Sequence, residues 1–159
     1  MSLDKILKHL EQKVSHADAT NPKISSKGVD WHIDHSLKVI NGIILSLKKS
    51  NPSEYQWKFN VTRTYILIKG SIPRGKGKAP KSVVNDTTII LTDIENQLKE
   101  AKELILELDS LPKNSNFKHP YFGLLNLRMS KRFLKIHTNH HLKIIDDIIK
   151  EVSKNQKKN

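Results

Sequence analysis

Hydrophobic residues recur every three or four positions along several stretches of this 159-residue chain, a spacing that places them on one face of an α-helix. The first stretch runs from about Leu3 to Ala17 and ends before the helix-breaking pair Asn21-Pro22. The second begins at the capping residues Ser25-Ser26 and continues to about Lys49. Their apolar faces consist of Ile6, Leu7, Leu10 and Val14 in the first stretch, and of Ile33, Leu37, Ile40, Ile44 and Leu47 in the second. Both stretches are therefore predicted to be amphipathic helices.

The third stretch, Tyr55 to Gly70, is ambiguous, because its centre from Tyr65 to Ile68 is β-branched and aromatic. We favour a helix, since no other stretch of similar composition offers a partner strand. A polar loop rich in Gly, Pro and Lys follows from Ser71 to Asn85. Its length is unusual for a compact domain and is typical of a functional or a mobile segment.

Two further helices are predicted in the second half of the chain. The first is capped by Asp86 and stopped by Pro112, and it repeats apolar residues with the narrow seam of a bundle helix: Leu91, Ile94, Leu98, Ala101, Ile105 and Leu108. A connector from Asn114 to Leu125 leads to the last helix, which Asn126 caps and which runs to about Val152. We therefore predict an all-α fold, a four-helix bundle formed by a single domain over residues 1–152, with a frayed basic tail at 153–159.

Composition limits the classes of function. The chain carries 28 Lys and Arg against 16 Asp and Glu, a formal charge of +12, but its lysines are spread over nearly every segment. They are concentrated only at Lys69–Lys81 and Lys150–Lys158, so a solvated surface is favoured over a nucleic-acid footprint. The absence of cysteine excludes disulfides and thiolate ligands and, with no apolar leader or membrane-spanning stretch, indicates a cytoplasmic protein.

A P-loop-like match occurs inside the basic loop. Gly70 to Lys76 satisfies G-x-x-x-x-G-K, but Gly77 follows where a hydroxyl is needed for magnesium. Ala79-Pro80 then replaces the helix whose N-terminus would hold phosphate. The match is therefore not interpreted as a nucleotide site. Two readings of loop 69–81 stay open: a basic flap over the open end of the bundle that attracts an anionic substrate, and a solvated disordered loop.

The candidate chemistry lies in the histidines. His137 and His141 are four residues apart, near the middle of the apolar stripe of the last helix, so that their Cβ atoms are about 5–6 Å apart. Buried imidazoles at this spacing indicate either a metal site or hydrogen-bonded core histidines. No glutamate accompanies the pair in a zincin motif, since Thr138 stands at that position. Three imidazoles with one open position would suit zinc, nickel or iron.

The third ligand is open from the residues alone. The second helix offers His32 and His35, and its helical wheel places His32 nearer to the apolar centre. On the last helix, His140 lies about 60° away from His137 on the side opposite to His141, at the edge of the stripe. The pattern therefore predicts His137 and His141 together with one histidine of the second helix.

At these residues the chain resembles the DinB/YfiT-like superfamily of metal-dependent enzymes, and it looks closest to an uncharacterised branch of it. The resemblance covers about residues 25–149. It rests on the segment Gly28-Val29-Asp30-Trp31-His32-Ile33-Asp34-His35, on the turn His119-Pro120-Tyr121-Phe122-Gly123, and on His137-Thr138-Asn139-His140-His141-Leu142. It implies a four-helix bundle in which His35, His137 and His141 bind a divalent metal. His32 stands where relatives usually carry an apolar residue, which leaves room for a fourth ligand or a swap.

The resemblance also implies a class of function. Some members are thiol-dependent transferases or isomerases, and others are hydrolases, so the expected partners are a small-molecule substrate and a low-molecular-weight thiol, with a homodimer as the expected assembly. Asp34 and Asp146 are candidates for supporting the ligands, although a surface role is favoured for both. Two alternatives remain. One is a basic binding module for nucleic acid or an acidic partner, with a structural metal or none; the other is a helical protein whose activity has been lost.

Overall fold

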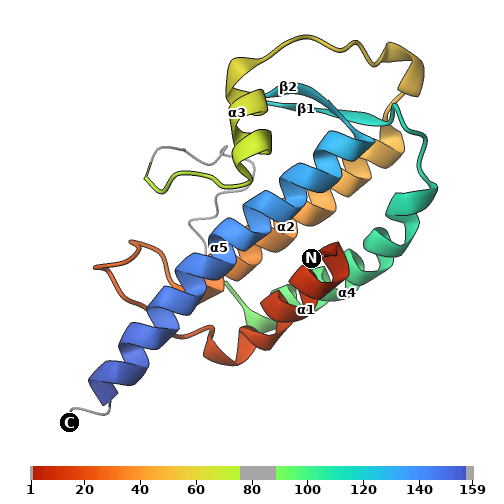
Figure 1. Ribbon diagram of the computed structural model, residues 1–159. Helices are drawn as coiled ribbons and strands as arrows, with labels where there is room; N and C mark the ends of the chain where they lie inside the picture. The colour runs from red at the N-terminus through yellow and green to blue at the C-terminus, as the bar shows by residue number, and fades with distance from the viewer. Residues whose placement is uncertain (1, 76–88, 157–159) are drawn as a thin grey trace.

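The structure is a computed structural model that describes residues 2–75 and 89–156 (Figure 1). Its elements are mostly helical, which confirms the predicted fold class at that level, but they include a two-stranded sheet that the sequence pattern did not predict. The elements are α1 (Leu3–Gln12), α2 (Val29–Lys49), α3 (Val61–Lys69), α4 (Leu91–Glu107), β1 (Asn116–His119), β2 (Gly123–Asn126) and α5 (Leu127–Gln156). No helix in this part of the chain has both the length and the apolar composition needed to cross a membrane.

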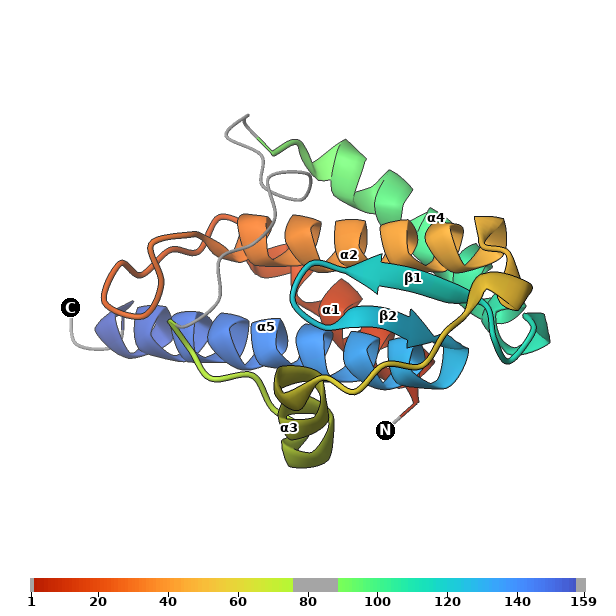
Figure 2. The same ribbon diagram turned by 90° about the horizontal axis from the view of Figure 1, so that it is seen from above.

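The two long helices α2 and α5 lie side by side and form the centre of the structure (Figures 1 and 2). α4 packs against α2, and α1 contacts both α4 and α5. The β-hairpin and α3 lie on the other side of the α2–α5 pair. The largest fully buried side chains are apolar and come from all four of the helices α1, α2, α4 and α5, and from β2: Ile6, Leu10, Ile33, Leu37, Ile40, Ile44, Leu47, Ile94, Leu125, Leu134, Ile145 and Ile148.

The helix boundaries differ from the predicted ones at several ends. α2 begins at Val29, with Gly28 at its N-cap, because the segment containing Ser25-Ser26 forms a loop instead of the first turn. The predicted cap Asn126 is confirmed, since its Oδ1 accepts a hydrogen bond from the backbone N–H of Met129 at 3.0 Å. α5 continues past the predicted end to Gln156. The predicted cap Asp86, residues 76–85 of the predicted loop and tail residues 157–159 lie outside the described residues.

The ambiguous third stretch is helical only in its second half. α3 is capped by Asn60, whose Oδ1 accepts from the N–H of Arg63, and it ends at Gly70, which has a φ of +70°. This left-handed conformation costs glycine little and stops the helix. The connector 114–125 is a β-hairpin, with Phe117 paired to Leu125 and His119 to Gly123. Its four-residue strands are too short for a period of two to be seen in the sequence.

A buried arginine connects α3 to this hairpin. The Arg63 side chain is 3% exposed, and its guanidinium donates hydrogen bonds to the carbonyls of Lys58, Phe122 and Leu124. An ammonium group cannot span three carbonyls in this fork geometry. We expect Arg63→Lys to lower the free energy of unfolding by about 3 kcal/mol, for two lost charged hydrogen bonds of about 1.5 kcal/mol each.

Urea denaturation would measure this change. Exposed Arg128 offers the matched control, because the same substitution there should alter stability by less than about 0.5 kcal/mol. Equal effects at both positions would contradict the structural role of Arg63.

Candidate metal centre

The packing of α2 against α5 brings four histidines together. His137 and His141 lie one turn apart on α5, and His32 and His35 lie one turn apart on α2. The ring centroids of His35 lie 5.1 Å from His137 and 4.8 Å from His141, and the two α5 rings are 4.6 Å apart. His35 and His141 are buried and His137 is half-buried. The three predicted ligands therefore meet in the interior, at the seam between the two long helices.

The nitrogen atoms of these three rings have the spacing of a ligand shell. One ligand atom from each of His35, His137 and His141 lies within 4.8 Å of the other two. The Nε2 atoms of His35 and His137 are 3.3 Å apart. In a tetrahedral site with metal–nitrogen bonds of about 2.0–2.1 Å, two ligand nitrogens are separated by about 3.3–3.4 Å. The same distance permits a hydrogen bond between two neutral imidazoles in the metal-free protein. The arrangement is thus compatible with a metal site.

Burial favours the neutral form of the two α5 histidines. Desolvation lowers the pKa of His137 and of His141 well below the ordinary value, and the neighbouring imidazoles lower both pKa values further. A histidine binds a metal through the lone pair of one ring nitrogen, so the imidazole must be neutral. At neutral pH these two histidines therefore offer lone pairs without a cost for deprotonation, and a set of three imidazole nitrogens suits zinc, nickel or iron.

His32 lies beside the three rings but is not one of the convergent set. Its Nδ1 is 2.9 Å from the Nδ1 of His141, and its Nε2 is 3.0 Å from the Oγ of Ser25. Burial, followed by the charge of His35, lowers the pKa of His32 to about 4. Both of its ring nitrogens thus have protein partners. Of the two histidines on α2, His35 converges with the α5 pair, and His32 contacts one member of it.

His140 is not one of the three histidines whose ligand atoms converge. Its ring donates a hydrogen bond to the backbone carbonyl of Ile72 and lies edge-on to His141 at 5.3 Å. Nearby, the guanidinium of Arg74 pairs with the carboxylate of Asp147 at 2.7 Å. These contacts hold residues 71–75, the described start of the predicted basic flap, against α5. The rest of loop 69–81, from residue 76, lies outside the described residues.

An aromatic wall borders the site. The ring of Trp31 stacks parallel to His35, with centroids 4.8 Å apart and an interplanar angle of 6°. The ring of Phe133 lies 5.5 Å from that of His137. Trp31 and His35 are four residues apart on α2, so they share a helix face.

His119 of the predicted His-Pro-aromatic-Phe-Gly motif has a structural place in the hairpin turn. Its Nδ1 accepts hydrogen bonds from the backbone N–H groups of Tyr121 and Phe122, and its ring stacks on that of Phe122 at 4.2 Å. Burial lowers its pKa to about 4. Its ring also lies 4.8 Å from that of Phe133 on α5, so His119 connects the hairpin turn to the last helix.

The two predicted supporting carboxylates do not contact the histidines in the described structure. Asp34 is buried, against the surface role predicted for it, because its oxygens pair with Lys38 at 2.6 Å and with Gln97 at 2.9 Å. Asp146 is at the surface and pairs with Lys13 at 2.6 Å. The sequence also did not predict the contact of Ser25 with His32, since Ser25 was interpreted as a helix cap.

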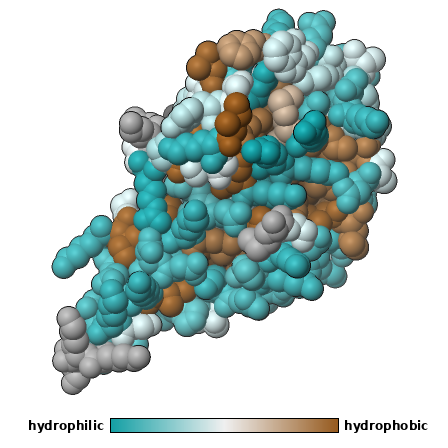
Figure 3. Space-filling view, viewed as in Figure 1, coloured by the Kyte–Doolittle hydropathy of each residue, from teal (hydrophilic) through white to brown (hydrophobic). Residues whose placement is uncertain are grey.

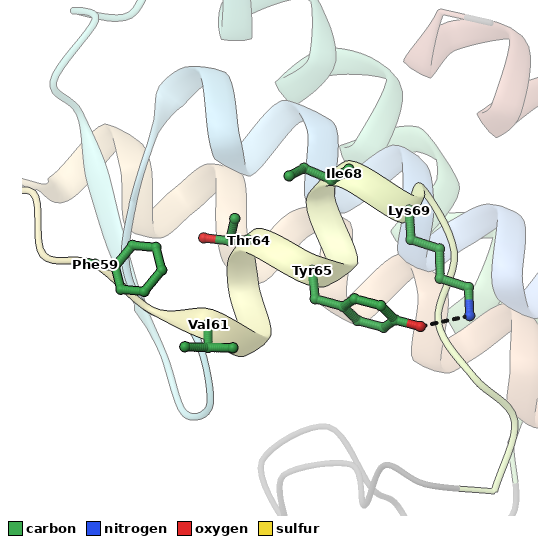
Figure 4. Close-up of a pocket in the computed structure, with 6 residues that line it drawn as sticks. All are labelled: Phe59, Val61, Thr64, Tyr65, Ile68 and Lys69. Carbon is green, nitrogen blue, oxygen red and sulfur yellow. Dashed lines mark hydrogen bonds between the residues drawn. The ribbon is translucent and has the colours of Figure 1, made fainter.

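The surface shows a second feature, apart from the histidines. Figure 3 shows a mostly hydrophilic face with apolar residues in patches between the polar ones. A shallow apolar pocket of about 290 Å³ lies on α3 (Figure 4), and it is lined by Phe59, Val61, Thr64, Tyr65, Ile68 and Lys69. It contains no group of metal-ligating side chains, so it adds nothing to the chemistry of the site.

Comparisons of the chain with protein-family models, with curated proteins and with solved structures find no match. The functional conclusion therefore depends on the geometry and chemistry of the histidine cluster.

Proposed function

We propose that this protein is a divalent-metal-dependent enzyme that holds its metal through His35, His137 and His141. The observation that carries this proposal is the convergence of three imidazole nitrogens within 4.8 Å of one another at a helix–helix seam. Three protein ligands leave one tetrahedral position for a substrate or a water molecule, which is the pattern of catalytic zinc sites.

The proposal includes membership of the DinB/YfiT-like superfamily, with its four-helix bundle. Two features support it. α2 contacts both α4 and α5, and α1 contacts the same two helices, as expected when α1, α2, α4 and α5 surround one core. The ligand set that the resemblance implied, with His35 in place of His32, is also the set whose nitrogens converge.

The surroundings of the three histidines define what the protein contributes. A bound divalent metal would supply a Lewis acid and would lower the pKa of a water or thiol held at its open position. Among the described residues, the convergent group consists of three histidines and includes no carboxylate. Trp31 stacks over His35 and shields that ring from solvent.

The lack of an available general base among the described residues considered for that role favours a thiol over water as the reacting partner. Asp34 and Asp146 pair with lysines, and Thr138 occupies the position of the zincin glutamate, so none of these three residues acts as a general base. A thiol with a pKa of about 8.5 needs much less assistance to ionise than water. We therefore propose a thiol-dependent transfer to a small electrophilic substrate, with hydrolysis as the less favoured reaction.

Trp31 provides a direct test of metal binding, because the chain has only two tryptophans. The other, Trp57, is 64% exposed, so Trp57→Phe leaves Trp31 as the only fluorescent tryptophan. We expect its emission to change on addition of Ni²⁺ and to saturate at one equivalent per chain, since Trp31 stacks on the ligand His35. Elemental analysis of protein prepared without a histidine tag should give the same stoichiometry.

A chain that binds no metal in either experiment would contradict the proposed function. If such a protein bound DNA with an affinity that falls steeply with salt, the alternative of a basic binding module would take its place.

A further inference from the structure

We infer that His32 is a positioning residue for the metal ligand His141: it accepts a hydrogen bond from Nδ1–H of His141 and thereby directs the Nε2 lone pair of His141 to the metal. This inference rests on the proposed metal site. It concerns a residue that the three-histidine set does not include and that replaces the apolar residue expected from the resemblance.

The contacts form a chain of three side chains. The Nδ1 atoms of His141 and His32 are 2.9 Å apart, and the Nε2 of His32 lies 3.0 Å from the Oγ of Ser25. That Oγ also accepts a hydrogen bond from the backbone N–H of Lys27 at 3.1 Å, which fixes the serine in the loop before α2. The His32 side chain is 4% exposed, so solvent does not replace these partners.

Counting protons gives two arrangements for the hydrogen-bonded series His141–His32–Ser25. Two nitrogen atoms at 2.9 Å share one proton, because a neutral imidazole carries a proton on only one of its nitrogens. If the proton is on His141, His32 accepts at Nδ1 and donates from Nε2–H to Ser25, and the Nε2 of His141 is left as a lone pair. If the proton is on His32, the hydroxyl of Ser25 donates to it, and the Nε2 of His141 carries a hydrogen. Only the first arrangement gives His141 a free ligand atom on the side of the ring away from His32.

The role is one that metal sites require. A metal-binding histidine usually donates its second N–H to a carboxylate, a carbonyl or water, and this partner fixes both the tautomer and the orientation of the ring. Here the acceptor is a neutral imidazole. It orients the ligand without adding negative charge, and the other described members of the site are also histidines. Because both nitrogens of His32 are engaged, it does not serve as a fourth ligand in this arrangement.

Two substitutions at position 32 separate orientation from bulk. His32→Leu removes the acceptor and keeps an apolar side chain, whereas His32→Asn can place an amide oxygen near the former Nδ1. We expect His32→Leu to weaken zinc binding by about 10–100-fold, as is typical when such a partner is lost, while one zinc still binds per chain at saturation. We expect His32→Asn to bind zinc within a few-fold of the wild type, and Ser25→Ala to lose less affinity than His32→Leu. Competition with a chelator of known affinity measures all four proteins.

Nitrogen NMR of the zinc-loaded wild-type protein gives a second readout that does not depend on a variant. With ¹⁵N-labelled histidine, we expect the proton of His141 on Nδ1 and a through-hydrogen-bond ¹⁵N–¹⁵N coupling between the Nδ1 atoms of His141 and His32. A His141 ring protonated on Nε2 would overturn the inference, even if His32→Leu failed to fold.

The outcomes distinguish the inference from the proposed function. Unchanged zinc affinity in His32→Leu would overturn the role of His32 and leave the metal site intact. Zinc bound directly to His32, seen as a metal shift of its own ring nitrogen, would also overturn it. A wild-type protein that binds no zinc would instead contradict the proposed function.

Discussion

Replacing His137 by alanine is expected to lower the affinity for zinc by two to three orders of magnitude. Apparent binding energies of about 10–16 kcal/mol for four-ligand zinc sites correspond to about 2.5–4 kcal/mol for each ligand. Each 1.4 kcal/mol is about a tenfold change in affinity. His137 lies at the centre of the cluster, 3.3 Å from His35 between Nε2 atoms and with its ring 4.6 Å from that of His141. Chelator competition with the purified variant would measure the loss.

The neighbouring histidine provides a matched control. His140 lies on the same helix with its ring 5.3 Å from His141, but its hydrogen bond goes to the backbone of Ile72. His140→Ala removes the same group without removing a proposed ligand, so zinc affinity should stay within a few-fold of the wild type. Equal losses in the two variants would indicate a general effect of histidine removal, and an unchanged affinity in His137→Ala would contradict the assigned ligand set. Circular dichroism would confirm that each variant is folded.

Acidification from pH 7.5 to pH 5 is expected to remove about 4 kcal/mol from the unfolding free energy of the metal-free protein through His32 and His119 alone. Burial lowers the pKa of each to about 4, whereas in the unfolded chain each titrates near 6.5. Below pH 6.5 the unfolded chain therefore binds protons that the native state does not bind, which favours unfolding. At pH 5 this difference is about 2 kcal/mol for each residue.

His137 and His141 act in the same direction, because burial lowers their pKa values further. Domains of this kind are typically stable by about 5–15 kcal/mol, so a large part of the stability should be lost in mild acid. Urea unfolding at a series of pH values would show this as a midpoint that falls from pH 6.5 downward. A midpoint independent of pH over this range would contradict the burial of neutral histidines.

The contribution of His119 to the pH dependence of the unfolding free energy can be removed by substitution. Its Nδ1 accepts from two backbone N–H groups of the hairpin turn, and an asparagine oxygen can take that place without titrating. His119→Asn should therefore reduce the loss of stability between pH 7.5 and pH 5 by about 2 kcal/mol, while its hairpin stays formed. If His119→Asn loses as much unfolding free energy between pH 7.5 and pH 5 as the wild type, the contribution assigned to His119 would be contradicted.

Several features of the fold were accessible from the sequence because they depend on local spacing. The apolar periodicity predicts the helices α1, α2, α4 and α5, although the first was predicted to continue to Ala17 and α1 ends at Gln12, and Asn126 caps α5 as its residue type indicates. The hairpin around Gly123 was not predicted, because two strands of four residues are too short to show alternation and their pairing is a non-local contact. Asp34 was predicted to lie at the surface but is buried. Its partner Gln97 belongs to a different helix, so spacing along α2 does not reveal this contact.

The sequence by itself determined that His137 and His141 share one face of the last helix, because four residues make about one turn and the apolar stripe passes through both. Only the tertiary structure decided how the histidines of α2 meet that pair. The rotation of α2 about its axis and its contact with α5 bring His35 to both α5 rings, and they set His32 between His141 and Ser25. A periodic pattern identifies the buried side of a helix, but the direction in which each side chain meets another helix depends on packing between segments far apart in the chain.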